Sequence, residues 1–232
     1  MEEFEKKDCI INYSDNVVGA WKRILNKDFK QKFYGEGVDC VYNLLIDIIK
    51  DYTNEEENID ILKDILVESY EKLINNYGKE KILREILKDQ GKETMVRPVL
   101  EGRSSVEDMI MRNSYYLTNL DILILMKYFK LPVLLVSGKR LNELQRWSLS
   151  TNLRKLTKPI NKPQHLMNKK ERGLQKLWII NRNLESSKYY IIKQPTILRN
   201  KPYNYSLISS DSKLYITEDE LDDNMRRLLI LY

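Results

Sequence analysis

The chain has little of the chemistry on which many enzymes depend. Its 232 residues include one histidine, His165, and two cysteines, Cys9 and Cys40. So few cysteines argue against a disulfide-stabilised scaffold and favour a reducing compartment. The sequence contains no Cys/His cluster with zinc-ligand spacing and no Walker-type phosphate loop. We therefore expect no metal site and no cofactor.

Long apolar runs are also missing. No stretch of about 18 apolar residues is present, which excludes a membrane-spanning helix. Residues 1–8 lack the basic flank and apolar block of a secretion signal. Hydrophobic residues still make up 42% of the chain and charged residues 31%. This balance predicts one large domain with a hydrophobic core and a solvated surface.

Positive charge is concentrated in one segment. The chain carries a formal net charge of +5, yet residues 139–172 alone hold about +8. The basic residues there that are suited to nucleic-acid phosphates are Lys139, Arg140, Arg146, Arg154, Lys155, Lys158, Lys169, Lys170 and Arg172. Such a segment could contact nucleic acid or an acidic protein surface. A solvated insertion loop is the simpler interpretation, and both remain open.

Apolar periodicity predicts helices first and a small sheet afterwards. Helices are expected over residues 17–25, 41–52, 59–77, 79–89, 104–112, 118–129 and 217–229. Strands are expected over residues 133–136, 177–180, 188–193 and 203–209. This order predicts an α+β fold, with mixed α/β as the alternative: a small, central, mostly antiparallel sheet flanked by helices, and a helical amino-terminal half. We expect an amino-terminal arm (1–34) and a single domain (35–232) with a basic insertion at about 139–172.

The most reactive-looking segment is a glycine-containing turn that leads to Cys40. A cysteine at the start of a helix suits a thiol nucleophile, and backbone amides near Gly35 and Gly37 could cradle an oxyanion. The alternatives are a buried cysteine and glycines that serve only to turn the chain. A thiol enzyme also needs a base nearby. Only His165 could supply an imidazole, and its basic, proline-containing surroundings predict an exposed residue.

Three segments, in order, resemble the ovarian-tumour (OTU) family of cysteine deubiquitinases. Residues 38–42, Val-Asp-Cys-Val-Tyr, are similar to the motif that opens the family's catalytic helix. Residues 106–137 resemble its middle part, where Tyr115 or Tyr116 stands at the place of a common tryptophan. Residues 177–180 and 188–190 resemble the strand pair that ends in His-Tyr. The resemblance implies an OTU-like fold in which Cys40 is the nucleophile, if the chain is active.

The departures from this family pattern concern the chemistry. Gly37 stands where the family has an aspartate, and Asp39 stands where it has an asparagine. Lys188 occupies the position of the general-base histidine. A lysine with an ordinary pKa near 10.4 is protonated at neutral pH and cannot accept the thiol proton. It could lower the pKa of the thiol through its charge, but turnover would be poor.

These patterns predict a catalytically impaired OTU-like domain that acts as a structural or protein-interaction module. An active cysteine-type deubiquitinase that uses Cys40 is the first alternative. A nucleic-acid-binding accessory protein that uses residues 139–172 is the second. The chain is rich in Lys, Asn, Ile and Tyr, as expected of a protein encoded by an AT-rich genome. This composition, together with so divergent a domain, resembles proteins of large DNA viruses. The implied partners are ubiquitin or a viral structural protein, and the implied location is cytoplasmic or virion-associated.

Overall fold

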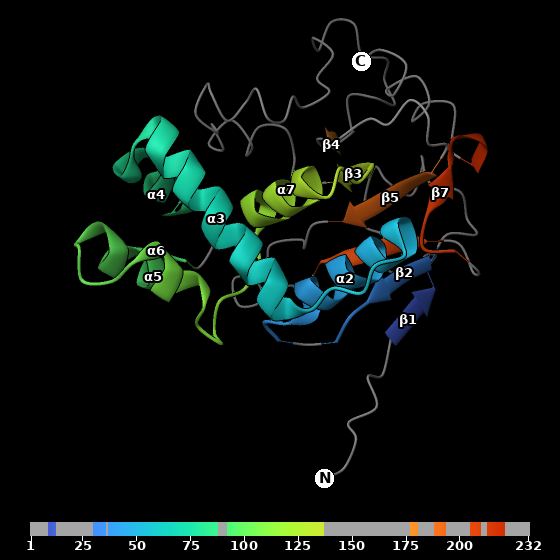
Figure 1. The fold of residues 1–232 in the computed structure, drawn as a ribbon. Helices are drawn as coiled ribbons and strands as arrows, with labels where there is room; N and C mark the ends of the chain where they lie inside the picture. Colours follow the sequence, from blue (N-terminus) through green and yellow to red (C-terminus); the bar gives the residue numbers. More distant parts are fainter. Residues whose placement is uncertain are drawn as a thin grey trace, which may run out of the picture.

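The computed structural model describes residues 9–12, 30–35, 37–87, 92–136, 177–180, 188–193, 205–209 and 213–220. These residues form an α+β fold in which helices lie against a sheet (Figure 1). The described strands are β1 (Cys9–Asn12), β2 (Lys30–Phe33), β3 (Val133–Val136), β4 (Leu177–Ile180), β5 (Lys188–Lys193), β6 (Ser206–Ser209) and β7 (Ile216–Thr217). The expected α+β class is therefore confirmed.

The sheet is mostly antiparallel. Its strand order is β1-β2-β6-β5-β3-β4, with β7 paired to β5. Only the β3–β5 pair is parallel among the described strands. The predicted strands 133–136, 177–180 and 188–193 agree with the structure, and the predicted strand 203–209 is narrowed to residues 206–209. The fully apolar sequence of β3 fits its place between two neighbouring strands.

Two strands lie within residues 1–34, which the sequence analysis treats as an arm. β1 pairs with β2, and β2 pairs with β6, so this part of the chain extends the sheet. The sequence pattern did not predict either strand, because Lys30-Gln31-Lys32-Phe33 has no apolar alternation. Its pairing with β6 decides its conformation. The predicted helix over residues 17–25 lies outside the described residues.

Helix α2 (Cys40–Thr53) lies across one face of the sheet. Its apolar stripe is fully buried and shares a core with Tyr190, Ile192 and Leu207 of the sheet. The Tyr190 hydroxyl donates a hydrogen bond of 2.6 Å to Asp51 near the end of the helix. The i, i+3, i+4 spacing of the stripe is the pattern that predicted this helix. The buried members of the stripe are Val41, Leu44, Leu45, Ile48 and Ile49.

Most of the remaining helices form a lobe beside the sheet, and the last of them, α7, lies next to β3 (Figure 1). They are α3 (Ile59–Tyr77), α4 (Lys79–Leu87), α5 (Glu93–Leu100), α6 (Val106–Ile110) and α7 (Asn119–Tyr128). Local signals set their ends: the Asn58 side chain accepts from the Ile61 backbone N–H at 3.0 Å, and Gly78 ends α3 at φ 91°. The sequence did not predict α5, which is short and contains Pro98. Tertiary burial of Val96 and Val99 compensates for its weak helical propensity.

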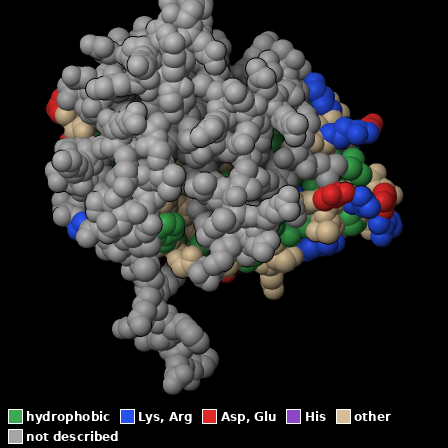
Figure 2. Space-filling view, turned by 180° about the vertical axis from the view of Figure 1, so that it is seen from behind, with side chains coloured by type: hydrophobic (Ala, Val, Ile, Leu, Met, Phe, Trp, Pro, Cys, Tyr) green, Lys and Arg blue, Asp and Glu red, His purple; other side chains and the backbone are tan. Residues whose placement is uncertain are grey.

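The surface of this lobe carries both signs of charge (Figure 2, right-hand side). Exposed ion pairs four residues apart join Lys72 to Glu68 and Arg84 to Glu80. Pairs of this kind contribute little to stability but keep the helix surface solvated.

None of the helices in the described part of the chain has the length and apolar character that a membrane crossing requires. The predicted terminal helix over residues 217–229 does not begin as expected, because Thr217 lies in β7 and residues 218–220 form a 3₁₀ turn; residues 221–229 lie outside the described residues.

Helix α3 offers a direct test of where the core lies. Leu66 is fully buried in the core, whereas Ile61 on the same helix is 39% exposed. We expect Leu66→Ala to lower the free energy of unfolding by about 2–5 kcal/mol, because it leaves a cavity. Ile61→Ala is the matched control and should change it by roughly 0.5 kcal/mol or less. Urea unfolding of both variants measures this, and equal effects would contradict the described packing.

Candidate functional site

The turn before α2 has the backbone geometry that its glycines predict. Gly35 and Gly37 have φ values of 82° and 120°. These conformations suit glycine, and a side chain added at either position would meet no other atom within 4 Å. The glycines are therefore needed for their positive φ angles, which turn the chain. A side chain at either position would not collide with neighbouring atoms. The turn ends at Asp39, whose carbonyl oxygen accepts from the Asn43 backbone N–H at 2.9 Å.

Cys40 is the first residue of α2, as the sequence predicts, but its thiol is buried. The residue is 4% exposed and is present as a thiol. Burial raises the pKa of Cys40 to about 12, and the nearby Asp39 carboxylate adds to the rise. Hydrogen bonds from the Val41 and Cys40 backbone N–H groups act in the opposite direction and are weaker. At neutral pH the thiol therefore keeps its proton and is a poor nucleophile.

The structure places Lys188 and Cys40 at opposite ends of α2. Lys188 begins β5, where it pairs with Thr217 of β7, and the Tyr190 hydroxyl two residues later donates to Asp51. Asp51 is eleven residues after Cys40, which is about 16 Å along a helix axis.

The other end of β5 lies toward Cys40. Lys193 pairs with Ser206, and Ser206 pairs with Phe33, the last residue of β2 before the glycine turn. The Lys188 ammonium instead lies over the Tyr215 ring, 4.4 Å from its centroid. Lys188 could have lowered the pKa of the thiol through its charge, but it is not among the groups that shift the pKa of Cys40, and it lies near the opposite end of α2.

Two further predictions concern residues outside the described part of the chain. His165 and the whole basic segment 139–172 lie outside the described residues. Cys9 lies in β1, at the sheet edge formed by the amino-terminal strands. Among the described residues, no group of three or more His, Cys, Asp or Glu side chains could hold a metal ion.

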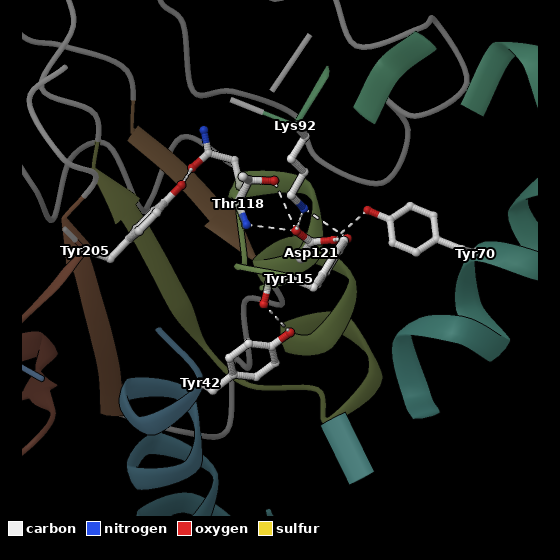
Figure 3. Close-up of polar contacts among 8 residues, drawn as sticks. Tyr42, Tyr70, Lys92, Tyr115, Thr118, Asp121 and Tyr205 are labelled. Atoms are coloured by element: carbon white, nitrogen blue, oxygen red, sulfur yellow. Dashed lines mark hydrogen bonds and ion pairs between the residues drawn. The ribbon is translucent and has the colours of Figure 1, made fainter. Parts of the chain in front are cut away.

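A buried polar network that the sequence analysis missed connects α2, α3, α5 and α7 (Figure 3). Its centre is the fully buried Asp121 carboxylate, which forms an ion pair with the equally buried Lys92. Tyr70 and Tyr115 donate to Asp121 Oδ1 at 2.7 and 2.8 Å. The backbone N–H and hydroxyl of Thr118 donate to Oδ2 at 2.8 and 3.1 Å. Every oxygen of this carboxylate is thus satisfied, as a buried charge requires.

The network also reaches the helix that carries Cys40. The Lys92 ammonium donates to the Tyr115 hydroxyl at 2.9 Å, and Tyr42 of α2 donates to the Tyr115 carbonyl oxygen at 3.3 Å (Figure 3). Burial, followed by the Asp121 charge, raises the pKa of Tyr115 well above its ordinary value, so this hydroxyl remains a donor. All these groups bond to one another, and the arrangement is that of a structural clamp.

One sequence signal pointed toward this clamp. Asp121 stands three residues after Thr118 at the start of an apolar helix, which is a capping box, and the structure contains that box. Nothing near Lys92 in the sequence marks it as buried. Tyr115 and Tyr116, of which one stands at the place of the family's common tryptophan in the resemblance, are 0% and 6% exposed.

No family model, curated protein or solved structure matches this chain.

The clamp predicts a large difference between two lysines. Lys92→Met leaves the Asp121 carboxylate buried without its countercharge, and we expect a loss of about 3–5 kcal/mol in the free energy of unfolding. Lys72→Met is the control, since its pair with Glu68 is exposed, and it should cost less than about 1 kcal/mol. Chemical denaturation followed by circular dichroism measures both values. Similar losses for the two variants would show that Lys92 is not buried as described.

The raised pKa of Cys40 predicts how stability depends on pH. Between the ordinary value of 9.0 and about 12, the unfolded chain loses the thiol proton while the folded chain keeps it. The unfolded state then binds fewer protons, so stability falls as the pH rises through this range. We expect Cys40→Ala to remove this part of the decline. The measurement is the free energy of unfolding of both proteins at a series of pH values in this range. Parallel plots of this free energy against pH would contradict a buried, protonated thiol.

Proposed function

We propose that this protein is a catalytically impaired OTU-like domain that acts as a structural or protein-interaction module. The observation that carries the proposal is the state of Cys40. Its thiol is buried, its pKa is about 12, and the lysine at the family's histidine position lies near the other end of α2. A thiol in this state lacks the activation that nucleophilic catalysis requires.

The order of elements supports the OTU-like part of the proposal. A helix that begins at a cysteine packs on a mostly antiparallel sheet. The strands that resemble the family's strand pair, β4 and β5, lie on either side of β3 in that sheet and do not pair with each other. The clamp supports the structural part, because it holds α2 against the lobe through groups that are all bonded to one another. Ubiquitin or a viral structural protein remains the proposed partner, and a cytoplasmic or virion-associated location is proposed with it.

The two alternative functions, an active deubiquitinase and a nucleic-acid-binding protein, depend on different parts of the chain. An active deubiquitinase needs Cys40 to become exposed and deprotonated, which the observed burial opposes. Nucleic-acid binding depends on residues 139–172, which are outside the described residues, so it remains a prediction from the charge pattern. The described helices carry mixed charge, which does not add to a phosphate-binding surface.

A ubiquitin vinyl sulfone probe tests the proposal against its main alternative. The probe forms a covalent adduct only with an activated cysteine, so we expect no adduct with the wild-type chain or with Cys40→Ala. An active OTU deubiquitinase assayed in parallel confirms that the probe works. As a second readout, iodoacetamide should label Cys40 in urea and leave it unlabelled in buffer, with Cys9→Ser as the background to remove the other thiol. An adduct that forms with the wild type and disappears in Cys40→Ala would overturn the proposal.

A further inference from the structure

The face of the sheet opposite α2 carries three polar side chains from adjoining strands. Side chains alternate between the two faces of a strand. Ile192 and Leu207 pack in the core shared with α2, so their neighbours Lys193 and Ser206 point to the other face. These two residues are direct partners across β5 and β6, and Gln31 of β2 bonds to Ser206 from the same side. We call these three residues the Lys193 cluster.

The cluster is largely buried, yet one of its polar atoms is buried and unsatisfied. Gln31, Ser206 and Lys193 are 4%, 0% and 8% exposed. The Gln31 amide nitrogen donates to the Ser206 hydroxyl at 2.6 Å. In the described part of the chain, the Gln31 amide oxygen accepts no hydrogen bond, and the Lys193 side chain makes no hydrogen bond, ion pair or ring contact. Unsatisfied buried groups are rare in proteins and call for an explanation.

The other buried lysines show that Lys193 is an exception. Lys63 is 6% exposed, and its ammonium donates to the Arg112 carbonyl oxygen at 3.2 Å. Lys92 is paired with Asp121. Lys193 has no such acceptor among the described residues, and burial alone lowers its pKa. A largely buried lysine side chain without a countercharge is costly, and an anionic ligand would offset that cost.

We infer that the Lys193 cluster binds the carboxylate of an N-acylated α-amino acid, a chemistry shared by free N-acyl amino acids and by the carboxyl terminus of a peptide. The Lys193 ammonium and the Ser206 hydroxyl are donors for the two carboxylate oxygens. The Gln31 amide oxygen is an acceptor for the adjacent N–H of the ligand. The single positive charge matches a monoanion and would leave a phosphate dianion only half neutralised.

This inference goes beyond the proposed function, and it does not involve Cys40. The Lys193 cluster lies on the opposite face of the sheet from α2. Failure of the binding experiment below would leave the labelling result at Cys40 unchanged. A covalent adduct at Cys40 would in turn leave the binding result unchanged.

Titration calorimetry of the whole chain tests the inference with three ligands: N-acetylglycine, acetyl-triglycine and N-acetylglycinamide. We expect both acids to bind and the amide not to bind, because only the acids supply the negative charge. Equal affinity for the two acids would identify free N-acyl amino acids as the source of the ligand. Tighter binding of acetyl-triglycine would identify a peptide terminus.

Variants on the two faces of the sheet assign the binding site. Lys193→Met should weaken binding of the acids roughly tenfold or more, the usual effect of losing a hydrogen bond to a charged group. Ser206→Ala is a second variant that should weaken it less. Lys32→Met is the control, because Lys32 precedes Phe33 in the same strand as Gln31 but pairs with Asp47 of α2 at 3.2 Å. Its affinity should equal that of the wild type.

Three results would overturn the inference. The first is no binding of either acid up to about 10 mM, beyond the millimolar range of a weak ligand. The second is equal binding of N-acetylglycinamide, which would show that charge plays no part. The third is wild-type affinity in a folded Lys193→Met variant, with folding checked by circular dichroism.

Discussion

The ion pair between Asp121 and Lys92 is the interaction on which the helical lobe depends. Both side chains are fully buried, so each needs the other to offset the loss of water. Tyr70 brings α3 to the same carboxylate, and Thr118 joins it to the start of α7. Through Tyr115 the network extends to Tyr42 and so to α2. One carboxylate thereby sets the positions of helices that are far apart in the sequence.

The same packing explains the chemistry at Cys40. Holding α2 tightly against the sheet and lobe buries the first residue of the helix together with its apolar stripe. Water is then excluded from the sulfur, and the pKa of the thiol rises because the thiolate cannot be solvated. The start of a helix normally favours a thiolate. Here the cost of burial exceeds that effect, and a position typical of a nucleophile holds a protonated thiol.

Much of the fold was predictable from residues 40–136 and from the strands that follow them. The apolar stripe of α2, the capping signals of α3 and α7 and the apolar run of β3 are local patterns, and each agrees with the structure. Strands β1 and β2 and helix α5 were not predicted, because their sequences have no clear period or contain Pro98. Contacts with distant residues determine the conformation of these segments.

The sequence by itself determined the α+β class and the cysteine at the start of a helix. It could do so because periodicity, capping and residue identity are properties of short segments. Only the tertiary structure decided that Lys188 lies far from Cys40, that Lys92 meets Asp121, and that Lys193, Ser206 and Gln31 share one face. These relations depend on strand order and helix packing. They arise between residues as many as 175 positions apart, whose proximity no local pattern encodes.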